Sequence, residues 1–203
     1  TLGKEYTNII TLAGSFHGRT ITTLAATGQE IFHSQFQPLT PGFLYAEPEN
    51  IAQMEQLLEE NPCAAILLEP VQGEGGVKAL DFSYLQQVEQ LAKKHGALLI
   101  VDEVQCGNGR TGKLYGYMHS GIHPNIITTA KGLAGGLPLG ATLFDEKTAN
   151  VYQPGDHGST FGGNPICCAG AINVLQRLDE TFLQQVEEKS KLIAEMLTGA
   201  RGI

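Results

Sequence analysis

The sequence has 203 residues, with 21 acidic and 13 basic side chains and a formal net charge of −8. This acidity argues against nucleic acid and anionic membranes as partners, because both attract clustered Lys and Arg. Hydrophobic residues make up 42% of the chain, enough for a sizeable core. The longest apolar runs, such as Ala97–Val101, are far too short to cross a bilayer. The sequence therefore predicts a globular protein that binds neither nucleic acid nor membrane.

Short apolar runs alternate along the chain with stretches of helical periodicity. Strands are predicted at Asn8–Leu12, Ala64–Leu68, Ala97–Val101, Ile126–Thr129 and Ala141–Phe144. Helices are predicted at Thr20–Ala26, Ile51–Glu59, Phe82–His95, Ile166–Leu178 and Phe182–Leu197. This alternation favours an α/β fold, with a mostly parallel sheet covered by helices on both faces. Functional residues in such sheets lie beyond the carboxyl ends of the strands.

The cysteines and histidines indicate neither a disulfide framework nor a metal site. The four cysteines form no C-x-x-C pair and are Cys63, Cys106, Cys167 and Cys168. Reduced thiols in a cytoplasmic protein are the simpler interpretation. His119 and His123 have the spacing of one helical turn, but Gly121 and Pro124 argue against a helix there. We therefore expect no bound metal.

A glycine-rich segment suggests nucleotide binding as an alternative function. Gly107–Gly112 fits G-x-G-x-x-G, and with Lys113 it also fits G-x-x-x-x-G-K. A phosphate-binding loop, however, needs a hydroxyl after this lysine to hold Mg²⁺, and Leu114 stands there. A dinucleotide site needs an acidic residue about 20 residues further on, and no Asp or Glu occurs between Glu103 and Asp145. A tight loop at the end of the sheet is the favoured interpretation.

Two charged residues follow predicted strands and suggest a different chemistry. Asp102 ends an apolar strand, and Lys131 stands in a glycine-rich segment directly after another strand. A lysine in apolar surroundings can present a nucleophilic amine to an aldehyde. Pyridoxal phosphate is a cofactor that requires both groups, because its aldehyde bonds to a lysine and its ring nitrogen takes an acidic partner. Each residue alone has an ordinary explanation, a turn-capping aspartate or a solvated loop lysine.

Five motifs in this order resemble those of class III aminotransferases. They are Ser15-Phe16-His17-Gly18-Arg19-Thr20, Glu69-Pro70-Val71-Gln72-Gly73-Glu74-Gly75-Gly76, Asp102-Glu103-Val104-Gln105, Thr129-Ala130-Lys131-Gly132 and His157-Gly158-Ser159-Thr160-Phe161-Gly162-Gly163-Asn164-Pro165. The resemblance implies the large domain of a fold-type I pyridoxal-phosphate enzyme. Under this interpretation residues 1–203 are its central part, a fragment without the upstream segment and the C-terminal small domain.

The resemblance also implies a role for each matched residue. Lys131 would form the Schiff base and move protons, and Asp102 would pair with the ring nitrogen. The remaining cofactor-binding residues would be Phe16, Glu103, Val104, Gln105 and Thr160, with Thr160 at the phosphate. Substrate would be bound by Arg19, at its α-carboxylate, and by Ser159 and Glu74, the last acting as a gate.

Within the family, the amino-acid sequence of Pro154–Gly163 resembles most that of members that act on N-acetylornithine. The implied reaction transfers its terminal amine to 2-oxoglutarate, a step of arginine biosynthesis. Ornithine, succinylornithine and 4-aminobutyrate remain alternative donors, because transaminases for them share most of these motifs. The resemblance further implies a cytoplasmic homodimer with shared active sites, in which Ser159 and Thr160 serve the partner's cofactor.

Overall fold

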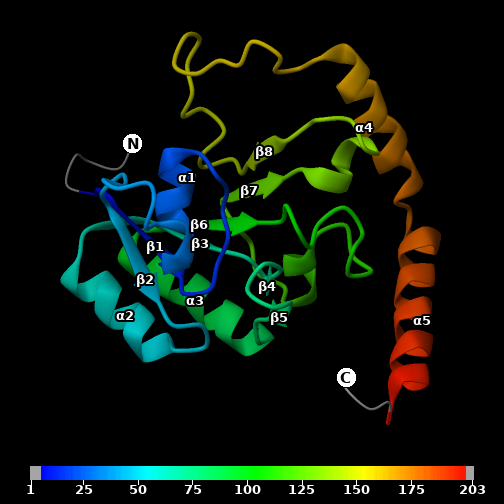
Figure 1. Cartoon of the computed structure of the whole chain (residues 1–203), viewed down its shortest axis with the longest axis horizontal. Helices are drawn as coiled ribbons and strands as arrows, with labels where there is room; N and C mark the ends of the chain where they lie inside the picture. Colours follow the sequence, from blue (N-terminus) through cyan, green and yellow to red (C-terminus); the bar gives the residue numbers. More distant parts are fainter. Residues whose placement is uncertain (1–5, 200–203) are drawn as a thin grey trace.

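A six-stranded sheet forms the centre of the molecule, with strand order β2-β1-β3-β6-β7-β8 (Figure 1). The computed structural model describes residues 6–199. The strands are β1 (Asn8–Leu12), β2 (Phe43–Ala46), β3 (Cys63–Leu68), β6 (Leu98–Asp102), β7 (Ile126–Thr129) and β8 (Ala141–Phe144). Neighbouring strands are parallel except β7 and β8, which are antiparallel. The prediction of a mostly parallel sheet is confirmed.

All five predicted strands are present, with boundaries that differ by at most one residue. The sequence analysis missed β2 and the hairpin of β4 (Val71–Gln72) and β5 (Lys78–Ala79). The run that forms β2 has only four residues, and Pro41 and Gly42 directly before it are typical of a loop. In the fold this short run pairs with β1 along its whole length and forms the edge of the sheet.

The helices begin and end at residues whose chemistry suits those positions. They are α1 (Ile21–Ala26), α2 (Ile51–Glu60), α3 (Phe82–His95), α4 (Pro165–Arg177) and α5 (Glu180–Leu197). Asp81 caps α3 by accepting a hydrogen bond from the Ser83 amide at 2.7 Å, and Gly96 ends it in the left-handed conformation. Asn164 caps α4, whose first residue is Pro165. These signals explain why the predicted helices were confirmed to within two residues at either end.

The main core lies between the sheet and the two helices α2 and α3. Their apolar faces pack on fully buried strand residues, including Ile10, Ile66 and Val101. The connections β1–α1–β2 and β2–α2–β3 run in opposite directions along the sheet. Right-handed crossovers therefore place α1 on the face opposite to α2, and α1 buries Leu24, Ala25 and Ala26 outside the main core.

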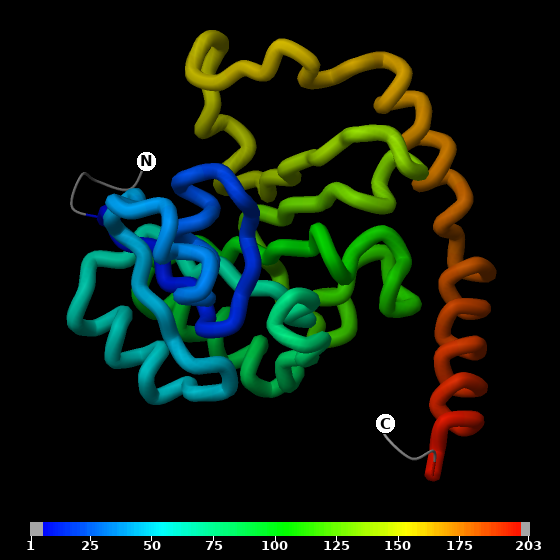
Figure 2. Tube along the Cα trace, in the orientation of Figure 1, coloured from blue at the N-terminus to red at the C-terminus, as the bar shows by residue number. Residues whose placement is uncertain are grey.

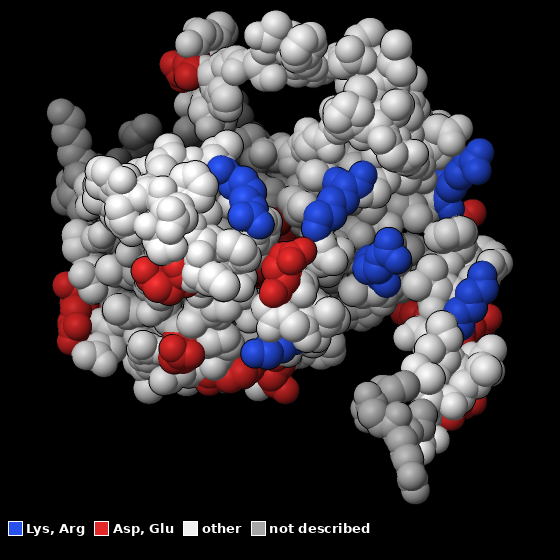
Figure 3. Space-filling model, viewed as in Figure 1, with Lys and Arg blue, Asp and Glu red and all other residues white. Residues whose placement is uncertain are grey.

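The chain beyond β8 leaves the sheet. Residues 145–164 form an arch above it and lead into α4, and α5 then runs along the side of the molecule (Figure 2). All four residues of β8 are exposed, and α5 has no buried residue. Within residues 6–199, no helix combines the length and apolarity needed to cross a membrane. On the face shown in Figure 3, basic side chains are scattered among neutral and acidic ones instead of forming a continuous basic surface.

Candidate active site

A pocket lies at the carboxyl ends of the parallel strands. It is lined by Phe16, His17, Gly18, Glu69, Glu74, Asp102, Val104, Gln105 and Lys131. These residues follow β1, β3, β6 and β7, which are four consecutive strands in the sheet. Parallel strands end at the same edge, so the fold brings together residues that are far apart in the sequence. Six of the predicted site residues meet here: Phe16, Glu74, Asp102, Val104, Gln105 and Lys131.

Lys131 occupies a backbone conformation that is uncommon for a residue with a side chain. It opens the short 3-10 helix η3 (Lys131–Ala134) with φ of 48°. Left-handed backbone at a non-glycine residue is unfavourable and is found most often at functional sites. The Lys131 ammonium donates a hydrogen bond to Oε1 of Gln105, across the pocket. The amine is therefore held inside the pocket beside a second predicted site residue.

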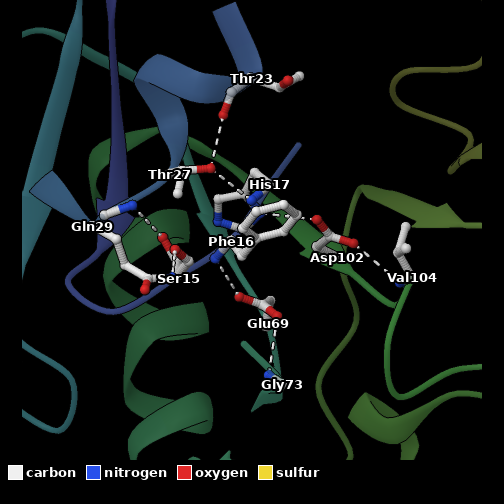
Figure 4. Close-up of polar contacts among 11 residues, drawn as sticks. Ser15, Phe16, His17, Thr23, Thr27, Gln29, Glu69, Gly73, Asp102 and Val104 are labelled. Carbon is white, nitrogen blue, oxygen red and sulfur yellow. Dashed lines mark hydrogen bonds and ion pairs between the residues drawn. The ribbon is translucent and has the colours of Figure 1, made fainter. Parts of the chain in front are cut away.

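Asp102 is held from two sides, as Figure 4 shows. Its Oδ2 lies 2.9 Å from Nδ1 of His17, and its Oδ1 accepts a hydrogen bond from the Val104 amide at 3.0 Å. The side chains of His17 and Asp102 are only 2% and 10% exposed. Ion pairs and hydrogen bonds gain strength when they are removed from water. The pocket thus has an anchored carboxylate at its base, with its orientation fixed.

Glu69 is a second buried acid on the pocket wall. Its carboxylate accepts hydrogen bonds from the amides of Phe16 at 2.9 Å and Gly73 at 3.4 Å (Figure 4). Burial raises the pKa of Glu69 and the charge of Asp102 raises it further, while the amide of Phe16 and the charge of His17 act in the opposite direction. Through these contacts Glu69 fixes the backbone that carries Phe16 into the pocket.

Glu103 does not line the pocket, although it was predicted as a cofactor-binding residue. Its carboxylate is fully buried and accepts hydrogen bonds from the amides of Tyr117 at 2.7 Å and Gly116 at 2.8 Å. Successive strand residues point to opposite sides, so the residue after Asp102 faces away from the site. Burial raises the pKa of Glu103. In this structure Glu103 holds the first two residues of the short 3-10 helix η2 (Gly116–His119).

Arg19 lies near the pocket but outside its lining. Its exposed guanidinium stacks on two aromatic rings, 4.6 Å from the centroid of Phe32 and 5.4 Å from that of Phe16. The two rings meet edge to face, with centroids 5.8 Å apart. Phe16 on the pocket wall and Phe32 beside it therefore form an aromatic surface that binds the Arg19 guanidinium.

Ser159 and Thr160 are not brought to this pocket. Both are exposed and lie on the arch of residues 145–164, which Figure 3 shows separated from the rest of the molecule by open space. Their predicted contacts with phosphate and substrate are therefore not formed within this chain. Three pocket residues received no predicted role: His17, Gly18 and Glu69. All three stand inside the quoted motifs, in the segments that follow β1 and β3, and this placement was the available signal.

The glycine-rich segment does not form a nucleotide-binding loop. Gly107–Gly112 belongs to a series of turns, and the next helical element is the four-residue η2 instead of a long helix. A phosphate-binding loop depends on the N-terminus of a helix. On α2 and α3, away from the pocket, side-chain atoms of Glu55, Glu59 and His95 that could bind a metal lie within 4.8 Å of one another. Glu55 is already paired with Lys94 at 2.6 Å.

Comparison with known proteins identifies the family. Residues 3–201 match the class III aminotransferase family. Acetylornithine aminotransferase of Haemophilus ducreyi is 49% identical over 195 residues, which cover 96% of this chain and 50% of that protein. The corresponding protein of Thermosynechococcus vestitus is 50% identical over 189 residues, covering 90% of this chain and 46% of the relative. The chain thus belongs to the class III aminotransferases.

Solved structures show the same fold. Ornithine aminotransferase of Toxoplasma gondii, described with pyridoxal phosphate at partial occupancy in its active site, matches with a TM-score of 0.90 and 35% identity, over 97% of this chain and 47% of that chain. An aminotransferase of Bacillus anthracis matches with a TM-score of 0.89 and 32% identity, over 95% of this chain and 49% of that one. The chain spans about half the length of the curated relatives it matches.

Proposed function

We propose that this protein binds pyridoxal phosphate at the pocket of Lys131 and transfers the terminal amine of N-acetylornithine to 2-oxoglutarate. The observation that carries the proposal is the presence of an amine, Lys131, and an anchored carboxylate, Asp102, around one pocket with an aromatic wall. The names of the relatives support the donor. The products would be N-acetylglutamate semialdehyde and glutamate, as in arginine biosynthesis, with the enzyme in the cytoplasm.

The residues of the pocket fit the cofactor. An aldehyde needs an amine, a protonated ring nitrogen needs an anion, and a flat ring needs apolar walls. Lys131, Asp102 and the pair Phe16 and Val104 offer these groups. When bound, the cofactor supplies a carbonyl that takes up the substrate amine and a ring that accepts electrons from the reacting carbon. The phosphate group has no predicted ligand in this pocket, because Thr160 lies on the arch.

Each pocket residue then has a definable task. Asp102, oriented by His17 and the Val104 amide, would keep a proton on the ring nitrogen by its negative charge. Lys131 Nζ would take a proton from the donor carbon and return it elsewhere, as a general base and acid. Gln105, now bonded to Lys131, would donate to the ring oxygen. Arg19 would hold the donor α-carboxylate, since a guanidinium suits bidentate geometry, with Glu74 as the gate.

We also propose a homodimer in which Ser159 and Thr160 complete the partner's site. Exposed apolar side chains on the arch and on α4 support this part, because isolated proteins rarely expose so many. They are Val151, Tyr152, Phe161, Ile166, Ile172 and Leu175.

Chemical trapping tests the proposal. Borohydride reduction of the protein loaded with pyridoxal phosphate should attach the cofactor irreversibly to Lys131, located by peptide mapping. Lys131→Ala should abolish the adduct, and Lys113→Ala, a matched change in a nearby loop, should leave it intact. An adduct on Lys113 or any other lysine contradicts the proposal. Turnover with N-acetylornithine should exceed turnover with ornithine, succinylornithine or 4-aminobutyrate; a preference for one of these would correct the donor alone.

A further inference from the structure

We infer that Asn108 is a positioning residue that holds the strained backbone of Lys131 and so directs its amine into the pocket. The inference rests on the proposed function, because it concerns the lysine to which the cofactor would attach. Asn108 belongs to the glycine-rich segment Gly107–Gly112, for which the sequence predicts a tight loop, and it does not line the pocket itself.

The strands β6 and β7 separate shortly before Lys131. Their ladder ends at Asp102 and Thr128, followed by a bond of 2.8 Å from the Glu103 amide to the Thr128 carbonyl. The chain after β6 then turns away from the sheet, while β7 continues for one more residue and leads to Ala130. On the side of β6, the backbone just before Lys131 therefore lacks a neighbouring strand.

Asn108 returns to this gap. Its Nδ2 donates hydrogen bonds to Oγ1 of Thr129 and to the Ala130 carbonyl, each at 3.0 Å. The Ala130 carbonyl also accepts a bond of 3.0 Å from the Leu133 amide, which closes the first turn of η3. One side-chain amide thus acts in place of the missing strand and ties together the end of β7 and the start of η3.

The backbone at both ends of this contact is unusual. Lys131 and Asn108 have φ of 48° and 55°, in the left-handed region. Such conformations persist only where surrounding contacts determine them. Asparagine tolerates left-handed backbone better than most residues, and here its amide also fixes the peptide that precedes the strained lysine.

The other polar atom of the Asn108 side chain, Oδ1, supports the same inference. Both protons of Nδ2 are used, and Oδ1 of Asn108 is buried without a partner among the described residues. A buried acceptor without a donor is unfavourable, so its retention beside Lys131 is better explained by function than by stability. A Cβ on Gly132, the second residue of η3, would lie 3.8 Å from Asn108 Cβ, so this side chain also lies beside the start of η3.

Two substitutions separate the amide from the backbone conformation. Asn108→Asp keeps the shape and the tolerance of left-handed backbone but removes both donated bonds. Asn108→Gly keeps the conformation and removes the side chain. In the holoenzyme we expect kcat to fall about tenfold in both variants, the equivalent of one or two lost hydrogen bonds, with KM for the amino donor unchanged. Visible circular dichroism per bound cofactor should weaken, because the amine that orients the cofactor is less fixed.

Asn125→Ala is the matched control. Asn125 is also an asparagine that joins strands, accepting from the Leu99 amide at 2.9 Å and donating to Asp145 at 2.6 Å, but it lies at the start of β7. It should lower the unfolding midpoint without altering the dichroism. Unchanged kcat and dichroism in both Asn108 variants would overturn the inference, as would loss of folding in both or the same dichroism change in Asn125→Ala. Borohydride trapping in the unmodified protein is measured alongside; its absence from Lys131 would overturn the proposed function together with this inference.

Discussion

The two parts of this chain, before and after β8, differ in how many of their side chains are buried. From β1 to β7, the strands and the helices α2 and α3 bury a common core, with Ile10, Ile66 and Val101 fully inaccessible. After β8, α4 buries only Cys167 and Ala171, and α5 buries nothing. The pocket is built by the first part, and the arch that carries Ser159 and Thr160 belongs to the second.

This difference shows which predicted site residues a single chain can assemble. Lys131 and Asp102 are positioned by neighbouring strands and need no other molecule. Ser159 and Thr160 are supported by an exposed arch (Figure 1). An exposed segment with apolar side chains is suited to contact with another subunit, and under the proposed function Ser159 and Thr160 would complete that subunit's site. Substitutions in each part can therefore test this difference.

Subunit complementation gives the largest expected effect, because transamination activity should appear in mixed dimers of two proteins that are each inactive alone. Lys131→Ala and Thr160→Val proteins, each inactive, are co-expressed and the mixed dimers are purified with two affinity tags. If Thr160 acts across the dimer, a mixed dimer has one site with both defects and one with neither, so transamination returns.

The control for complementation is a mixture in which both changes affect the same part. Lys131→Ala mixed with Asp102→Asn should restore nothing, because each site retains one defect. If Thr160 served its own pocket, the first mixture would stay inactive as well, and the arch would have to fold back onto the sheet.

Asp102→Asn should produce the next largest effect. The neutral amide cannot hold the ring nitrogen by charge, and a charged hydrogen bond is worth about 1.5–3 kcal/mol. We expect kcat of the holoenzyme to fall roughly ten- to a hundredfold, measured by steady-state turnover with the unfolding midpoint recorded in parallel. Asp145→Asn, outside the pocket, should leave kcat unaffected. Near-normal turnover in a folded, cofactor-loaded Asp102→Asn protein would reject the role.

The positions of the strand-end residues could be predicted from the sequence because local signals and sheet geometry agree. Asp102 and Lys131 each follow an apolar run, and parallel strands carry such residues to one edge. Glu103 was misplaced because the motif gives identity without direction, whereas strand alternation turns it toward Gly116 and Tyr117. The Asn108 contact could not be predicted from the sequence. It depends on how the loop after β6 returns to the end of β7, two residues before Lys131.

Stability should separate the two parts as clearly as activity does. Ile66→Ala removes a fully buried side chain of β3 and should lower the free energy of unfolding by about 2–5 kcal/mol. Ile172→Ala, on the exposed side of α4 with 56% of the residue accessible, should change it by less than about 0.5 kcal/mol in the monomer. Urea unfolding of dilute protein measures both. A similar loss for both would show that the second part buries α4 within its own chain.

The smallest expected effect is a slope in the dependence of stability on pH. Burial raises the pKa values of Glu69 and Glu103 above the ordinary value of 4.5. Between that value and the higher folded pKa, the folded protein binds more protons than the unfolded chain. The free energy of unfolding should therefore fall as pH rises through this interval, by at most about 1.4 kcal/mol per pH unit for each group. Because both acids lie in the first part, the slope reports on its core.

Glu69→Gln isolates one of these two contributions. Glutamine cannot ionise, so urea unfolding at several pH values above 4.5 should show a shallower decline than in the unmodified protein. Its single oxygen can accept from the Phe16 or the Gly73 amide but not from both, which lowers stability by a similar amount at every pH and leaves the slope interpretable. An identical decline in the Glu69→Gln protein would mean that this acid is hydrated in the folded state, and that the pocket wall is less closed than the rest of the first part.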